Sequence, residues 1–98
     1  MSWHVRVEPN ARREARTGLA FYASRDPKLA ARLSRKLERV LEEIGENPYR
    51  WAEVHDGIRE AIVGGWPYAI YYRVEDEAIS VFSIFNTNRD PQQWMDRV

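Results

Sequence analysis

The sequence predicts one α+β domain. A helical hairpin covers one face of a four-stranded sheet, formed by an N-terminal strand and a later three-strand antiparallel meander. Two observations support this fold. Apolar residues recur at helical spacing between residues 27 and 44, and three short runs after residue 56 are rich in β-branched and aromatic residues. Short connections between these runs favour antiparallel neighbours. Ninety-eight residues are the length of one domain, so residues 1–98 are assigned to a single domain.

The N-terminal strand is predicted by strict alternation over residues 3–8. Apolar Trp3, Val5 and Val7 alternate with polar residues, as in a half-buried strand. Pro9 ends the strand, and Asn10 is the expected N-cap of a helix over residues 11–23. Gly18 inside this helix costs about 1 kcal/mol relative to alanine, and we interpret it as a point where a second helix approaches closely.

The second helix carries the strongest pattern in the chain. Asp26 is its expected N-cap, and Pro27 suits the first helical position. A continuous apolar stripe follows at Leu29, Leu33, Leu37, Val40, Leu41 and Ile44. Gly45 and then Asn47 and Pro48 are expected to end the helix. The short connection between the helices predicts an antiparallel hairpin.

The meander is predicted over residues 57–63, 68–74 and 78–85, after an aromatic and acidic loop at residues 49–55. Gly64-Gly65 and residues 75–77 supply its turns, and a polar tail at residues 86–97 crosses one end of the sheet. With helices on one face, the other face is free for a partner or a site. The predicted core consists of Val5, Val7, Leu19, Leu33, Leu37, Val40, Ile70 and Val81.

The composition is that of an ordinary globular domain, with 44% hydrophobic and 31% charged residues. The chain has no cysteine, no apolar run near membrane-spanning length and no signal-peptide pattern, which favours the cytoplasm. The net charge is zero but uneven, with a balance of +6 over residues 1–40 and −6 over residues 41–98. Such asymmetry is compatible with an acidic partner, although a solvated basic helix face explains it as well.

No metal or cofactor is expected. His4 and His55 are isolated, and Gly64-Gly65 lacks the lysine and helix of a phosphate loop. What remains is a set of arginines and aromatic residues in the meander and tail: Arg59, Tyr68, Tyr71, Tyr72, Arg73, Arg89 and Trp94. Metal-free RNA cleavage needs a base, an acid and a cation at one phosphate. Arg59, Arg73 and Arg89 are candidates for the cation, but arginine is a poor base.

Three segments carry a family resemblance. The GIR sequence at residues 57–59, PYAIYYRV at 67–74 and NTNRDPQQWMDR at 86–97 resemble the ParE/RelE superfamily of type II toxin–antitoxin toxins. The ParE-like, plasmid-stabilisation branch is the most similar. The resemblance implies a small cytoplasmic toxin that an antitoxin neutralises by wrapping its surface in a hetero-oligomer. RelE-like members cut mRNA on the ribosome, whereas ParE-like members inhibit DNA gyrase.

The resemblance also assigns expectations to individual residues. Arg59 stands at a basic position of the nuclease branch, whereas Ala61 and Tyr68 stand where Lys or Arg is expected. Asn88 stands at another expected arginine, unless Arg89 takes that position by a shift of one residue. Trp94 replaces the tail tyrosine of the nucleases. The residues expected to bind a partner are Arg59, Tyr71, Arg73, Asn86, Arg89 and Trp94, with Asn86 standing where ParE-like members often have histidine.

The leading prediction is therefore a ParE-like toxin that inhibits DNA gyrase by binding. The alternatives are a RelE-like nuclease that acts on the ribosome and mRNA, and an inactive member that binds an antitoxin. We expect the antitoxin segment to bind along the helical hairpin and a sheet edge, and we expect no membrane association.

Overall fold

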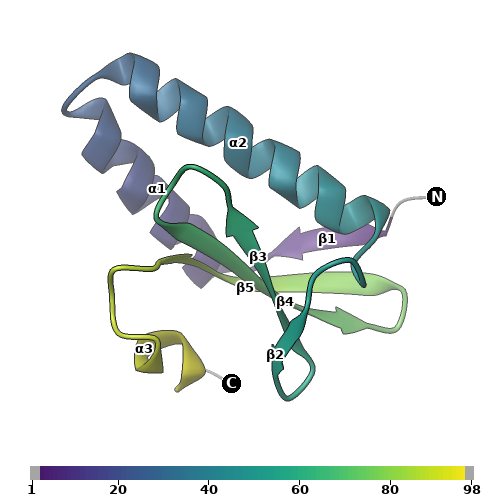
Figure 1. The fold of residues 1–98 in the computed structure, drawn as a ribbon. Helices are drawn as coiled ribbons and strands as arrows, with labels where there is room; N and C mark the ends of the chain where they lie inside the picture. The colour runs from purple at the N-terminus through teal and green to yellow at the C-terminus, as the bar shows by residue number, and fades with distance from the viewer. Residues whose placement is uncertain (1–2, 97–98) are drawn as a thin grey trace.

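The computed structural model describes residues 3–96 and confirms the α+β fold. Two long helices lie as an antiparallel hairpin on one face of a sheet, and a short helix lies on the other side (Figure 1). The elements are β1 (His4–Val7), α1 (Pro9–Ala23), α2 (Pro27–Glu46), β2 (Glu53–His55), β3 (Ile58–Val63), β4 (Tyr68–Glu75), β5 (Ala78–Asn86) and α3 (Gln92–Met95). None of the helices in the described range is long and apolar enough to cross a membrane.

The sheet has five strands in the order β1-β5-β4-β3-β2, so the prediction of four strands is wrong. The additional strand, β2, lies in the segment predicted to be a loop and pairs antiparallel with β3. Asp56 and Gly57 connect the two strands with positive φ angles of 42° and 80°. Asp-Gly is a favoured pair for a two-residue hairpin turn, because both positions must adopt this conformation. That turn was the overlooked signal for β2.

The predicted meander is confirmed in β3, β4 and β5, which pair antiparallel in sequence order. β1 joins the outer side of β5 in the parallel direction, so the sheet is mixed. This arrangement follows from the chain path, since a long connection between β1 and β5 permits parallel pairing. β1 and β2 therefore form the two edges of the sheet.

The helix boundaries differ from the predictions at two points. α1 begins at Pro9 with Glu8 in the cap position, so the prediction that Asn10 is the N-cap is wrong. α2 continues past Gly45 to Glu46 and has Asn47 as its C-cap, so the expected stop at Asn47 and Pro48 is confirmed, whereas Gly45 remains helical where β1 crosses α2. The Trp3 N–H donates to the Gly45 carbonyl over 2.7 Å, and an added Cβ would lie 3.1 Å from Val5. The Asp26 cap is confirmed, because its carboxylate accepts from the Lys28 N–H.

The main core lies between the hairpin and the sheet. The predicted core residues Leu33, Leu37, Val40, Ile70 and Val81 are buried there, whereas Val5, Val7 and Leu19 are partly buried at its margin. Tyr72 is fully buried, and its hydroxyl donates to the Pro48 carbonyl over 2.6 Å. Gly18 is a point of close approach, but Tyr68 of the sheet approaches it instead of the expected second helix.

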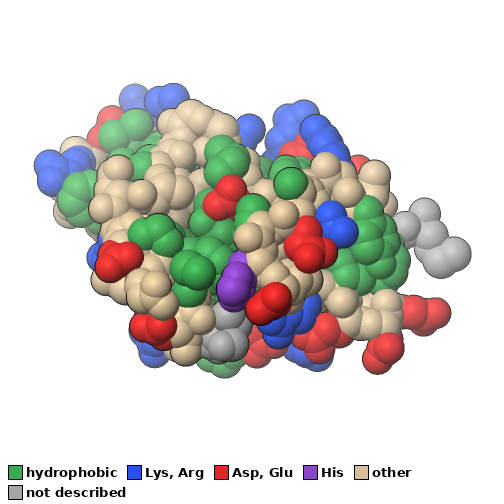
Figure 2. All heavy atoms as spheres, turned by 60° about the horizontal axis from the view of Figure 1, so that its bottom comes forward, with side chains coloured by type: hydrophobic (Ala, Val, Ile, Leu, Met, Phe, Trp, Pro, Cys, Tyr) green, Lys and Arg blue, Asp and Glu red, His purple; other side chains and the backbone are tan. Residues whose placement is uncertain are grey.

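A second, smaller cluster lies on the opposite face of the sheet. It contains Ile58, Ala69, Tyr71, Phe85 and Trp94, with Phe82 and Met95 at its margin. The tail brings Trp94 of α3 onto this face, which confirms that the tail crosses the sheet. Arg97, the last residue of the predicted tail, lies outside the described residues. Hydrophobic side chains also reach the surface on this side (Figure 2), and Ile62 is 56% exposed.

Candidate functional site

The three candidate arginines do not converge on one point. Arg59 lies on the helix-covered side of β3 beneath the chain that leads into β2. Arg73 lines a cleft beside the start of α1, and Arg89 lines a different cleft at the far end of the sheet. One phosphate therefore cannot contact all three side chains in this arrangement.

Arg59 is held by its surroundings. Its Nη1 donates to the Trp51 carbonyl over 2.6 Å, and its guanidinium lies 5.1 Å from the ring centroid of Tyr49. Burial raises the pKa of Tyr72 to about 12, and the positive charge of Arg59 opposes that rise. These contacts connect the loop after α2 to the sheet, which gives Arg59 a structural task.

Tyr71 and Trp94 form the centre of the sheet face opposite the hairpin, which is called the helix-free face because neither long helix covers it. Their rings stack with centroids 4.1 Å apart and planes inclined by 22°. The Tyr71 hydroxyl donates to Oε2 of Glu60 over 2.5 Å. Burial is the main reason that the pKa of Tyr71 is raised, and the hydrogen bond to Glu60 raises it further. Trp94 has the opposite, pKa-lowering effect. Tyr71 is therefore a neutral phenol at physiological pH and cannot act as a base.

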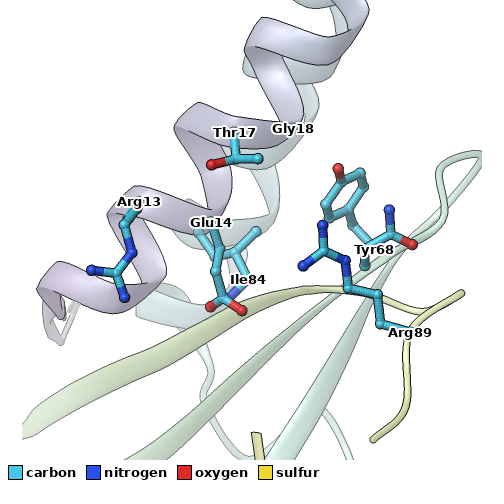
Figure 3. A pocket seen from close by; sticks show the side chains of 8 residues that line it. Arg13, Glu14, Thr17, Gly18, Tyr68, Ile84 and Arg89 are labelled. Atoms are coloured by element: carbon cyan, nitrogen blue, oxygen red, sulfur yellow. The ribbon is translucent and has the colours of Figure 1, made fainter. Parts of the chain in front are cut away.

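A partly open cleft of about 260 Å³ lies between α1 and the end of the sheet (Figure 3). Its lining comes from α1, the ends of β4 and β5, and the tail: Arg13, Glu14, Thr17, Gly18, Tyr68, Ile84, Asn86 and Arg89. Figure 3 shows the Arg89 guanidinium turned from the tail toward the cleft and the Tyr68 ring turned toward α1. Two predicted partner-binding residues, Asn86 and Arg89, thus share one cleft.

Electrostatics within this cleft are mixed. Oε1 of Glu14 accepts from the Ser83 hydroxyl at 3.0 Å and from the Ile84 N–H at 3.2 Å. Burial is the main reason that the pKa of Tyr68 is raised, and the nearby Tyr22 raises it further. The Asn86 side chain has the opposite, pKa-lowering effect. Sequence reasoning missed Arg13 and Glu14, because they lie about 70 residues before the strand they meet and no local pattern relates them.

Arg73 lies in a second cleft of about 360 Å³ on the helix-free side, together with Glu8, Ser80 and Phe82. The Ser80 hydroxyl donates to Oε1 of Glu8 over 2.8 Å, and Nε of Arg6 donates to the same oxygen over 3.1 Å. These two hydrogen bonds, with Ser80 the larger influence, lower the pKa of Glu8. Glu8 is thus an ionised acceptor and a poor proton donor.

Within residues 3–96 no group of three or more metal-ligating acidic or histidine side chains comes together. His55 lies 3.5 Å from the carboxylate of its neighbour Asp56. Neither His4 nor His55 lines the clefts that contain Arg73 and Arg89.

An N-terminal strand, a helical hairpin and an antiparallel meander, closed by an aromatic tail, define the fold of a small type II toxin. The chain belongs to the family of ParE toxins of type II toxin–antitoxin systems (parDE), whose model matches residues 5–91. Toxin RelE1 of Caulobacter vibrioides is 32% identical over 88 residues, which cover 88% of this chain and 95% of that protein.

A solved structure gives the same fold. The chromosomal ParDE system from P. aeruginosa contains a chain that superposes with a TM-score of 0.75. The match covers 87% of this chain and 96% of that chain at 16% sequence identity. The resemblance predicted from three sequence segments is therefore confirmed, and membership of this family implies an antitoxin as partner.

Proposed function

We propose that this toxin acts by binding its target and not by cleaving RNA, and that the target is DNA gyrase. The separation of Arg59, Arg73 and Arg89 carries the first half of the proposal, because RNA cleavage requires its groups at one phosphate. Gyrase is the target that the resemblance to the ParE branch implies, and acting on it places the toxin in the cytoplasm. A role in plasmid stabilisation rests on the same resemblance.

The positions that differ from the nuclease branch support this proposal. Ala61 is fully buried, and Tyr68 is 6% exposed with its hydroxyl against α1. Trp94 is 4% exposed, and its indole N–H cannot transfer a proton as a phenol does. A substrate thus finds neither a base nor an acid at these positions.

The accessible members of the predicted partner-binding set define the proposed target surface. Arg89 is exposed, and Asn86 is partly exposed beside it in the cleft at α1. Arg73 is partly exposed on the helix-free side. Tyr71 and Trp94 lie beneath that side and support it through their stacking.

Two parallel assays test this function. We expect the purified toxin to inhibit supercoiling by DNA gyrase and to leave mRNA intact on programmed ribosomes in a toeprinting assay. Arg89→Ala should weaken the inhibition, whereas Lys28→Ala, which removes an exposed cation in the first turn of α2, outside the proposed target surface, should not. Cuts at codon positions that disappear in Arg59→Ala would establish the RelE-like alternative. If the toxin neither inhibits gyrase nor cleaves mRNA, the remaining interpretation is an inactive protein that binds an antitoxin.

The antitoxin is proposed to bind the hairpin and the β1 edge of the sheet. An apolar groove of about 270 Å³ runs there between the helices, lined by Val7, Ala15, Leu37 and Leu41 and bordered by basic residues of α1. Because β1 has a neighbour on only one side, an extended segment can add to it as a further strand. The surface thus suits an amphipathic segment with apolar and acidic residues.

Co-expression with the adjacent short reading frame and a pull-down test this interface. Leu41→Arg should prevent co-purification, because it places a charge in the groove. Ile62→Arg is the matched control, since Ile62 is exposed on the opposite face and its replacement should leave the complex intact. Equal loss or equal retention in both variants would exclude this docking surface.

A further inference from the structure

The charges along α2 run against the helix dipole. Lys28, Arg32 and Arg35 lie in its first half, whereas Glu42 and Glu46 lie near its end. The first turn contains no acidic residue and the last turn no basic residue. A helix carries partial positive charge at its N-terminus and partial negative charge at its C-terminus, so the observed order destabilises α2. The stability of the helix therefore does not explain it.

These charged residues form one exposed stripe. Arg32, Arg35, Arg39, Glu42 and Glu46 follow one another at spacings of three and four, which keeps them on one side of the helix. All five are exposed, and they lie away from the buried stripe that meets the sheet. Figure 1 shows this outer side of α2 uncovered by any other element.

In the described part of the chain, the five residues of the stripe form no ion pair. Among residues 3–96, the ion pair that α2 makes joins Glu43 to Arg50 at 3.4 Å, off the stripe. Arg35 and Arg39 face each other at a spacing of four, as do Glu38 and Glu42. Like charges at this spacing repel, whereas Arg35 and Glu38, and likewise Arg39 and Glu42, carry opposite charges at a spacing of three, so the charges are only partly compensated within the helix.

We infer that the outer stripe of α2 is a contact surface between two copies of this chain, with the two α2 helices antiparallel about a two-fold axis. In this arrangement Arg32 lies opposite Glu46 of the second copy and Arg35 opposite Glu42. Arg39 lies opposite Glu38, an exposed residue that borders the stripe, and the symmetry repeats each pair. The stripe is thus complementary to itself, and the antiparallel helix dipoles add to the attraction.

A second copy fits the stripe better than other partners do. A nucleic acid or an acidic protein would pair with the arginines but would be repelled by Glu38, Glu42 and Glu46. Only a partner with the opposite order of charges satisfies both halves, and the antiparallel copy has that order. This contact is independent of the proposed action on gyrase.

The contact is small and dominated by charge. Twenty residues extend over about 30 Å of helix, and interfaces below about 1,200 Å² are characteristic of transient complexes. Exposed ion pairs are each weak and are screened by salt. The self-association is therefore reversible and strongly dependent on ionic strength.

Sedimentation velocity of the full-length toxin tests the wild-type behaviour. At about 0.1 M salt the sedimentation coefficient should rise with protein concentration up to about 100 μM. At about 1 M salt the Debye length falls to about 3 Å, and the sedimentation coefficient should then be independent of protein concentration. A wild-type protein that stays monomeric at low salt overturns the inference, as does an association that survives high salt unchanged.

A pair of charge-reversed variants tests the geometry. Arg32→Glu/Arg35→Glu makes the stripe mostly acidic, and Glu42→Arg/Glu46→Arg makes it mostly basic. Each variant alone should be monomeric, whereas an equimolar mixture should associate as the wild type does, because all the proposed pairs are restored. Circular dichroism confirms that each variant is folded. A mixture that fails to associate overturns the antiparallel pairing.

Arg13→Glu/Arg89→Glu is the matched control, because it makes the same charge change at the cleft on the other side of α1. This variant should associate as the wild type does at low salt. Loss of association in this control would mean that overall charge, and not the α2 stripe, drives the contact, which would also overturn the inference.

Discussion

Tyr71 and Trp94 connect the tail to the sheet through a stack of 4.1 Å between ring centroids. Trp94 is the buried residue of α3, a helix of only four residues. Its Nε1 is buried without a hydrogen-bond acceptor in the described part of the chain. The tail is thus held mainly by the packing of the Trp94 ring, with Met95 at the margin of the same cluster, and the buried donor without an acceptor partly offsets that gain.

Trp94→Ala should therefore release the tail from the helix-free face. We expect the free energy of unfolding to fall by about 3 kcal/mol, the lower end of the range for aromatic truncation, because the tail can detach without disturbing the main core. Limited proteolysis should then cut within residues 87–96. Trp94→Phe keeps a ring on Tyr71 and should retain most of the stability. A Trp94→Ala protein with wild-type stability and protease resistance would contradict this account.

Gly18→Ala tests the contact between α1 and the sheet. Alanine normally stabilises a helix by up to about 1 kcal/mol relative to glycine. Here its Cβ would lie 2.3 Å from the Tyr68 hydroxyl oxygen, so we expect a net loss of about 1–3 kcal/mol in a urea melt.

Removing that hydroxyl provides the control for Gly18→Ala. In a Tyr68→Phe background the substitution should cost less, and the double-mutant cycle should show a favourable coupling of about 1 kcal/mol. The rescue should be partial, since Cζ of Tyr68 would still lie 2.9 Å from the new Cβ. Strict additivity of the two substitutions would rule out the proposed clash.

Leu37→Ala tests the packing of α2 on the sheet. Leu37 is 5% exposed in the main core, so truncation should lower the free energy of unfolding by about 2–5 kcal/mol. Glu38→Ala, at the next and exposed position, should change it by less than about 0.5 kcal/mol. Similar losses in the two variants would mean that the buried stripe of α2 is assigned to the wrong face.

Stability should fall at alkaline pH because of the buried tyrosines. Burial raises the folded-state pKa of Tyr72 to about 12 from an unfolded value of about 10. The folded state thus holds its proton more tightly, so this contribution is complete below pH of about 10 and is lost as the pH rises through about 12. Urea melts across this window should show a falling free energy of unfolding.

Tyr72→Phe separates this effect from the titration of lysines. The variant loses the hydrogen bond to Pro48, so it should be less stable at neutral pH, but its stability should decline less steeply between pH values of about 10 and 12. A decline as steep as in the wild type would assign the alkaline loss to other groups.

The sequence predicted the elements whose patterns are local. The apolar stripe of α2, the Asp26 cap and the three meander strands all depend on residues close in the chain. β2 was missed because a strand of three residues is too short to show a recognisable alternating pattern, and its one local signal was the Asp-Gly turn that follows it. Asn47 and Pro48 predicted the end of α2, but no local pattern showed that Gly45 stays helical and makes room for β1, a contact across 40 residues.

The site could be predicted less well than the fold. Residue types alone suggested that the arginines form one group, but Arg59 and Arg73 point to opposite faces of the sheet. Arg13 and Glu14 join Asn86 and Arg89 only through the packing of α1 on β5. Such contacts depend on how the layers are stacked, which no local sequence pattern records.

Lys28→Glu tests whether the charge order of α2 lowers its stability. Lys28 lies in the first turn, exposed and one residue after Pro27, where the helix dipole favours negative charge. The substitution should raise the free energy of unfolding by about 0.3–1 kcal/mol. The introduced carboxylate also pairs with Arg32 at a spacing of four, which adds about 0.2–0.5 kcal/mol. Lys28→Gln should give a smaller gain and Lys28→Arg none, and about 1 M salt should reduce the differences. If Lys28→Glu is neutral or destabilising at low salt, the charges of α2 do not oppose its dipole in any measurable way, and the order of its charges needs no partner to explain it.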